Sequence, residues 1–245
     1  MPRPDRSRDL PLLHLVPNMM TLGAIAAGLT AVRLAVSGAF GPAVGLLAVA
    51  ALLDALDGRI ARLLGSESLI GAELDSLADV LNFGAAPAIL IYYWSLWQIP
   101  LAGWTAALVF AGCCALRLAR FNAAAKTAGT SGALFFTGVP SPAGALLALA
   151  PFALAQALPA LAPPAGAVAL WLVAMGLLMV SRLPTWSLKM RIPARLARPA
   201  LFGAGLFVVA LALWPWPVMV LAQAAYLLSL PFALRLAART ASRTT

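Results

Sequence analysis

Four aspartates lie at helical spacing in two consecutive apolar segments of the chain. Asp54 and Asp57 are three residues apart, and Asp75 and Asp79 are four apart, so each pair shares one face of a helix. If the two helices are antiparallel, the four carboxylates converge near one side of a membrane. An ionised carboxylate there costs several kcal/mol unless it is paired or bound to a metal. The spacing therefore predicts a functional site.

Hard divalent cations are the partners that suit such a set of carboxylates. Mg²⁺ and Mn²⁺ prefer oxygen ligands and often share them with substrate phosphates. Neither His nor Cys lies near the aspartates in the sequence, which disfavours zinc. A two-metal carboxylate site at the boundary of lipid and water predicts phosphoryl-transfer chemistry.

Two other interpretations of these acids remain open. In one, Arg59 and Arg62 form structural salt bridges, but two arginines cannot neutralise four close carboxylates. In the other, the chain is a cation-coupled transporter, in which intramembrane acids mark an ion path. A transporter predicts acids spread through the membrane depth and often across repeats. Here the acids cluster in two adjacent segments and no repeat is visible, which favours an enzyme.

The composition of the chain requires a membrane around these segments. Of 245 residues, 62% are hydrophobic and only 10% are charged, with a mean hydropathy of +0.93. A soluble domain carries roughly 25% charged residues. Because each crossing takes about 20 residues, the length suits one bundle. We predict an all-α, polytopic transmembrane helical bundle.

Apolar runs separated by Gly, Pro or charged residues predict about eight membrane spans. The predicted spans are Leu15–Val36, Pro42–Leu64, Leu74–Leu96, Leu101–Phe121, Pro140–Leu158, Gly166–Ser181, Pro199–Leu213 and Pro217–Leu236.

The basic residues predict the orientation of the bundle. With a cytoplasmic N-terminus, all 17 Lys and Arg except Arg33 lie on or next to the inner side. The predicted outer connections carry no charge, as the positive-inside rule requires. Residues 1–14 are then a cytoplasmic lead-in and residues 239–245 a cytoplasmic tail. The net charge of +9 does not indicate nucleic-acid binding, because the arginines sit at the ends of apolar segments, where they anchor a chain beside anionic headgroups.

The aspartates belong to a longer pattern. The run D-x2-D-G-x2-A-R-x8-G-x3-D-x3-D, from Asp54 to Asp79, resembles the signature of the CDP-alcohol phosphotransferase family, and every fixed position is met. Pro17–Thr21 also looks like that family's nucleotide-side segment. Four further segments resemble its bacterial phosphatidylserine synthase branch, namely Leu74–Pro87, Arg117–Asn122, Gly138–Pro142 and Met179–Lys189. The resemblance covers roughly residues 15–190.

This resemblance implies a fold, an activity and a location. The fold would be a six-helix core over residues 15–198, followed by two additional transmembrane helices over residues 199–238. The activity would be transfer of a phosphatidyl group from CDP-diacylglycerol to L-serine. The protein would be a homodimer in a bacterial inner membrane, with its active site facing the cytoplasm.

The resemblance also implies roles for particular residues. Asp54, Asp57, Asp75 and Asp79 would hold two divalent ions, Mg²⁺ or Mn²⁺, and Asp79 would also be the general base. The residues expected to bind CDP-diacylglycerol are Pro17, Asn18, Met19, Met20, Gly58, Ala61, Arg62, Ser68 and Gly71. Among these, Gly58 would let the nucleotide approach the helix backbone, and Arg62 would meet a phosphate with its forked donors.

Serine as the acceptor is expected from the branch resemblance alone. A serine zwitterion needs a cation for its carboxylate, which Arg117 and Arg120 would supply, and polar contacts from Asn82 or Asn122. Both arginines have an alternative role as interfacial anchors. An acceptor carrying phosphate, such as glycerol 3-phosphate or inositol phosphate, would use the same arginines, and choline is a further alternative.

Overall fold

The computed structural model describes residues 15–66, 68–127, 135–181, 184–186 and 194–241, and these are almost entirely helical. The α-helices are α1 (Val16–Val36), α2 (Phe40–Leu64), α3 (Leu69–Asp79), α4 (Ala86–Trp94), α5 (Pro100–Thr127), α6 (Ser141–Ala148), α7 (Ala150–Ala157), α8 (Ala165–Val180), α9 (Ala194–Leu213) and α10 (Pro215–Ala241). A π-helical segment, Val80–Ala85, joins α3 to α4. Short 3₁₀ turns follow α4 and α7, at Leu96–Gln98 and Pro159–Leu161.

The predicted fold class is confirmed. Four helical stretches are long and apolar enough to cross a membrane, and two shorter apolar helices accompany them. The four are Val16–Val36, Phe40–Leu64, Leu69–Trp94 and Pro100–Ala124, and the shorter two are Ala165–Val180 and Pro215–Leu230. One departure from an all-α chain is a small antiparallel ladder between β1 (Phe135–Thr137) and β2 (Pro184–Trp186). The chain is therefore a multi-pass helical membrane protein.

The third predicted span begins earlier than expected, at Leu69 and not at Leu74. The Gly71 backbone N–H donates a hydrogen bond to the Ser68 side-chain oxygen over 3.0 Å, so Ser68 caps the helix. A serine cap of this kind satisfies one of the free amides of the first turn. Because α3 begins at Leu69, both Asp75 and Asp79 lie within this helix.

The fifth predicted span is broken into α6 and α7 at Leu149. Pro151 causes the break, because it has no N–H to donate to the Leu147 carbonyl. The Trp171 indole N–H donates to the Leu147 carbonyl instead, over 2.8 Å. The Gln223 side-chain amide donates to the neighbouring Leu146 carbonyl, also over 2.8 Å. Helix α8 thus supplies the donor that the kinked helix lacks at Leu147, and α10 adds a second donor at Leu146, whose carbonyl also accepts from the Leu149 N–H.

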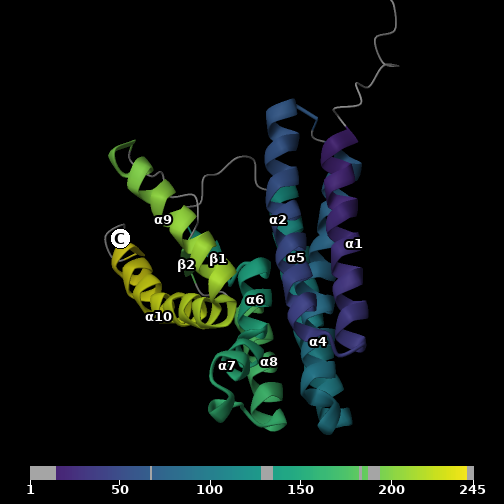
Figure 1. Cartoon of the computed structure of the whole chain (residues 1–245). Coiled ribbons are helices and arrows are strands. Elements are labelled where there is room, and N and C mark those ends of the chain that lie inside the picture. Colours follow the sequence, from purple (N-terminus) through teal and green to yellow (C-terminus); the bar gives the residue numbers. More distant parts are fainter. Residues whose placement is uncertain (1–14, 67, 128–134, 182–183, 187–193, 242–245) are drawn as a thin grey trace, which may run out of the picture.

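The helices pack through small side chains on one side and aromatic rings on the other. In Figure 1, α1 runs along α2, while α9 and α10 lie to the other side of α6. The face of α1 turned to its neighbours carries Ala24, Gly28 and Ala31, which permit close helix approach. Far from the aspartates, Phe152 packs edge-to-face against Trp216, with ring centroids 5.2 Å apart. This contact fixes α10 to the core.

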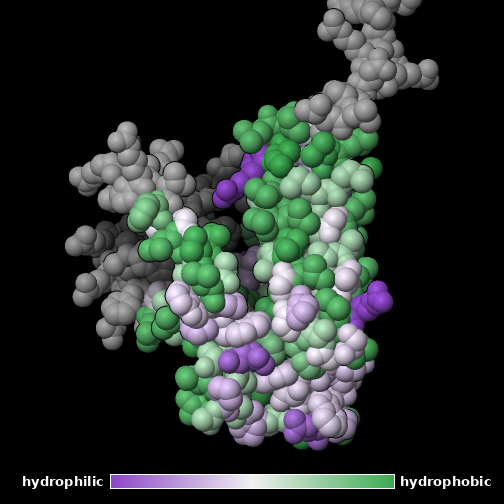
Figure 2. Space-filling view, viewed as in Figure 1, coloured by the Kyte–Doolittle hydropathy of each residue, from purple (hydrophilic) through white to green (hydrophobic). Residues whose placement is uncertain are grey.

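Hydrophobic residues, green in Figure 2, cover much of the upper part of the long helices, and paler residues cover the lower part. Large apolar side chains such as Leu52, Leu101 and Leu170 are more than half exposed. In a bilayer these side chains meet lipid rather than water, so their exposure costs little.

Candidate active site

A polar cavity of about 490 Å³ lies where α1, α2 and α3 meet. It is lined by Pro17, Asn18, Thr21, Asp57, Gly58, Ala61, Arg62, Ser66, Ser68, Leu69, Gly71, Ala72 and Asp75. Two of the four predicted aspartates are therefore on its wall. The other two, Asp54 and Asp79, lie one helical turn deeper on α2 and α3.

Two glycines shape this cavity. A side chain at Gly71 would put its Cβ 2.9 Å from Asn18 Oδ1, so it would displace the Asn18 amide where α3 meets α1. A Cβ at Gly58 would meet only Arg62 Nη1 within 4 Å, at 3.7 Å. The α2 backbone at Gly58 therefore faces open space, as expected for a wall that a ligand approaches.

Asp57 is held by two hydrogen bonds. Its carboxylate is 3% exposed. Thr21 Oγ1 lies 2.6 Å from Asp57 Oδ2, and the Gly58 backbone N–H donates to Asp57 Oδ1 over 2.6 Å. Thr21 was not among the predicted site residues. The available signal was its spacing, because Thr21 follows Pro17 by one helical turn and so shares its face.

Asp54 and Asp79 form a second pair, across α2 and α3. Their carboxyl groups lie within hydrogen-bonding range of one another. Asp54 Oδ1 is buried and has no hydrogen-bond partner in the part of the chain that the structure describes. Asp75 lies within electrostatic range of both Asp54 and Asp57, so the four acids form one connected group.

The four aspartates are also the predicted metal ligands. Among the described residues, no three His, Cys, Asp or Glu side chains converge closely enough to hold one metal ion. The aspartates pair between helices, Asp57 with Thr21 and Asp54 with Asp79, and do not form a closed cage. The donor set nevertheless fits a hard divalent cation, because it consists of oxygen atoms and includes the unpartnered Asp54 Oδ1. The two-metal assignment stays a prediction.

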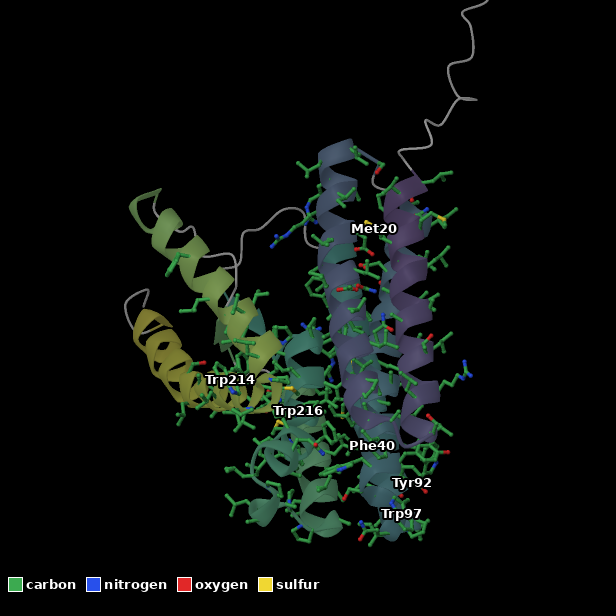
Figure 3. All side chains as sticks on the ribbon, in the orientation of Figure 1. Met20, Phe40, Tyr92, Trp97, Trp214 and Trp216 are labelled. Atoms are coloured by element: carbon green, nitrogen blue, oxygen red, sulfur yellow. The ribbon has the colours of Figure 1, made fainter. Side chains whose placement is uncertain are left out.

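Met19 and Met20 are the predicted CDP-binding residues that lie outside the cavity. They line a separate apolar hollow with Leu53 on the outer side of α1 and α2. Figure 3 labels Met20 near the N-terminal end of α1. Met20 follows Pro17 by three residues, so the helical period alone does not separate them. In the structure both methionines nevertheless lie on the outer side of α1. All the other predicted CDP-binding residues line the cavity.

Arg117 is a predicted acceptor residue that interacts electrostatically with one of the aspartates, Asp79. It reaches Ser141 Oγ over 2.6 Å through Nη1, and it lies within electrostatic range of Asp79. Its Nε is buried and has no hydrogen-bond partner among the described residues. Tyr226 of α10, which the sequence did not single out, also interacts electrostatically with Arg117. Its hydroxyl is buried and forms no hydrogen bond with any residue that the structure describes.

The other predicted acceptor residues have different surroundings. Arg120 is exposed, and its Nη1 donates to the Val180 carbonyl at the end of α8 over 3.1 Å. The Asn122 amide donates to Ser76 Oγ over 2.8 Å, tying α5 to α3. Asn82 lies in the π-helical segment on the wall of a large apolar cavity.

Comparison with known proteins identifies the class of enzyme. The family model for CDP-alcohol phosphatidyltransferases matches residues 14–179. A CDP-diacylglycerol–serine O-phosphatidyltransferase of Mycobacterium leprae is 38% identical over 234 residues, which is 94% of this chain and 77% of the relative. The enzyme of that name from Mycobacterium tuberculosis is 37% identical over 228 residues, covering 91% and 79%. The one from Bacillus subtilis is 36% identical over 141 residues, covering 57% and 77%.

The chain therefore belongs to the CDP-alcohol phosphatidyltransferase family. It is a multi-pass membrane enzyme of a family that generally uses divalent metal ions.

Proposed function

We propose that this protein transfers the phosphatidyl group of CDP-diacylglycerol to L-serine, giving phosphatidylserine and CMP. The names of the relatives aligned over most of the chain support this reaction. The observation that supports this reaction most is that the aspartate motif, together with Arg62, lines a polar cavity of nucleotide size.

We propose that the cytidine diphosphate occupies this cavity. Asn18 and Ser66 offer hydrogen-bonding groups on its wall, and the bare backbone at Gly58 allows close approach. Arg62 presents forked donors that match phosphate oxygens. Asp57 is already fixed by Thr21, so the wall beside the phosphates is ordered before substrate arrives.

The chemistry is a single displacement at the phosphorus that carries the diacylglycerol. The serine hydroxyl oxygen forms the new P–O bond and gives its proton to the Asp79 carboxylate. The phosphoanhydride P–O bond breaks and CMP leaves, with Arg62 balancing its charge. Arg117 lies within electrostatic range of Asp79, so its guanidinium would hold the serine carboxylate while the hydroxyl reaches the phosphorus. Arg120 and Asn122 would support this arrangement through their contacts with α8 and α3.

We propose that Asp54, Asp57, Asp75 and Asp79 hold two divalent ions, Mg²⁺ or Mn²⁺. When bound, these ions would neutralise the diphosphate and make the phosphorus more electrophilic.

We further propose where the enzyme acts and how its chain is divided. Basic residues gather at the predicted inner ends of the helices, which favours a bacterial inner membrane with the site facing the cytoplasm. The catalytic core would span residues 15–198, with residues 1–14 before it and the helices of residues 199–238 and the tail 239–245 after it. A homodimer remains the expected assembly by similarity.

The experiment that tests this function measures CMP release from CDP-diacylglycerol by the purified protein in detergent with Mg²⁺ or Mn²⁺. Serine, glycerol 3-phosphate, inositol, inositol phosphate and choline are offered separately. Release that depends on serine supports the proposal. Release with another alcohol would keep the mechanism but reject serine, and no release from folded protein would reject the reaction.

A further inference from the structure

Helix α10 turns the polar side chains of Gln223 and Tyr226 towards the helix bundle. The two residues are three apart, so they share one face of the helix. Gln223 is 2% exposed, and the hydroxyl oxygen of Tyr226 is buried. A polar group inside an apolar bundle is costly unless it is paired. In a membrane protein such a side chain therefore indicates a function.

The contacts of α10 lead towards the start of α6. Trp216 packs edge-to-face on Phe152 of α7, with ring centroids 5.2 Å apart. Further along α10, the Gln223 side-chain amide donates to the Leu146 carbonyl of α6 over 2.8 Å. Figure 1 shows the beginning of α10 beside α6. Tyr226 lies one helical turn beyond Gln223 and continues in this direction.

Tyr226 interacts electrostatically with Arg117 of α5. Arg117 Nη1 donates to Ser141 Oγ over 2.6 Å, and Ser141, the first residue of α6, is fully buried. The same guanidinium interacts electrostatically with Asp79. Arg117 therefore connects α10 and α6 with the aspartates.

Arg117 and Tyr226 each carry a polar atom that needs a partner. Arg117 Nε and Tyr226 Oη are both buried, and neither forms a hydrogen bond with a residue that the structure describes. The Nε–H group can only donate, whereas a phenolic oxygen can accept as well as donate. The two groups are therefore complementary, and a rotation of the side chains would join them. Because Ser141 already accepts from Nη1, Nη2 is then the terminal nitrogen left for a ligand.

We propose that Tyr226 is a positioning residue for the acceptor. Its hydroxyl oxygen accepts from Arg117 Nε–H, and this hydrogen bond turns Nη2 towards the carboxylate of serine. The inference rests on the proposed function, in which Arg117 holds that carboxylate. An arginine that is fixed by two partners loses less conformational freedom when substrate binds. Tyr226 lies beyond residues 14–179, which the family model matches, so the inference gives α10 a part in binding the acceptor.

Tyr226→Phe tests the inference, because it removes the hydroxyl alone. In the CMP-release assay KM for serine should rise about tenfold, as expected for the loss of a hydrogen bond to a charged group. KM for CDP-diacylglycerol should not change. An unchanged KM for serine, or an equal rise in both KM values, would overturn the inference.

Tyr93→Phe is the matched control variant. The Tyr93 ring is 41% exposed and packs edge-to-face on Tyr92 in α4. Figure 3 labels Tyr92 near the end of the bundle opposite to Met20. Tyr93→Phe should change neither KM value, and a rise in KM for serine equal to that of Tyr226→Phe would overturn the inference.

Thermal unfolding in detergent separates positioning from a structural role. Because the Tyr226 hydroxyl has no partner among the described residues, Tyr226→Phe should leave the midpoint of the ligand-free protein unchanged or raise it. Serine added with CMP should raise the midpoint of the unmodified protein by binding, and it should raise that of the variant less. A lower midpoint of the ligand-free variant, or an equal gain from serine, would overturn the inference. Serine-dependent CMP release by the unmodified protein is measured in parallel, because its absence would reject the proposed function itself.

Discussion

The hydrogen bond between Thr21 and Asp57 supports a sharp prediction. Thr21→Val keeps the shape of the side chain but removes the hydroxyl that lies 2.6 Å from Asp57 Oδ2. Asp57 is 3% exposed, so water cannot replace the lost partner easily. Hydrogen bonds to charged groups contribute roughly 1.5–3 kcal/mol. Because each 1.4 kcal/mol is about tenfold, kcat/KM for CDP-diacylglycerol should fall by about 10- to 100-fold.

The assay is CMP release at saturating serine, with CDP-diacylglycerol varied in mixed micelles. Thr30→Val on the same helix is the matched control, because the Thr30 hydroxyl is exposed and donates to the Ala26 carbonyl within its own helix. Thr21→Ser should restore most of the activity. Unchanged kinetics in Thr21→Val, or an equal loss in Thr30→Val, would refute the assignment of Thr21 as the residue that orders Asp57.

Further predictions concern the base, the metals, the α1–α3 contact and the fold. Asp79→Asn should abolish turnover while the protein stays folded and its affinity for CDP-diacylglycerol is weakened at most; near-normal CMP release would remove Asp79 as the base. EDTA should stop the reaction and added Mg²⁺ or Mn²⁺ should restore it, whereas insensitivity to EDTA would reject the two-metal proposal. Gly71→Ala places a Cβ 2.9 Å from Asn18 Oδ1, so KM for CDP-diacylglycerol should rise several-fold, and an unchanged KM would show that the contact gives way freely. Trp216→Ala removes the ring that packs on Phe152 at 5.2 Å and should lower stability by about 3 kcal/mol, seen as a lower thermal midpoint in detergent; an unchanged midpoint would mean that this contact does not hold α10 to the core.

The positions of the helices could be predicted because lipid leaves the backbone little choice. Every backbone amide and carbonyl in hydrocarbon must be paired within the protein, which makes an apolar run of sufficient length a helix. The first predicted span, Leu15–Val36, and the observed α1, Val16–Val36, differ by one residue at the start. The break at Leu149 was missed, although Pro151 is visible in the sequence. A proline inside a span is tolerated only when other helices satisfy the freed carbonyl, and that depends on Trp171.

The candidate site was predicted less completely than the fold. The spacing of the aspartates placed them on two helix faces, since helical periodicity is a local property. The same periodicity would have added Thr21, which lies four residues after Pro17. It could not have separated Met20, which lies three residues after Pro17, from the cavity residues. The contacts of Arg120 with Val180 and of Asn122 with Ser76 join helices distant in the sequence. No local pattern encodes them, because they depend on how α5 packs against α8 and α3.

The most direct test of the central claim is detection of the product itself. The purified protein is incubated with CDP-diacylglycerol and isotopically labelled L-serine, and the lipids are analysed by mass spectrometry beside an Asp79→Asn sample. We expect the unmodified enzyme to form labelled phosphatidylserine in an amount equal to the CMP released. The variant should form none. Labelled lipid formed equally by both proteins, or CMP released without labelled lipid, would contradict it.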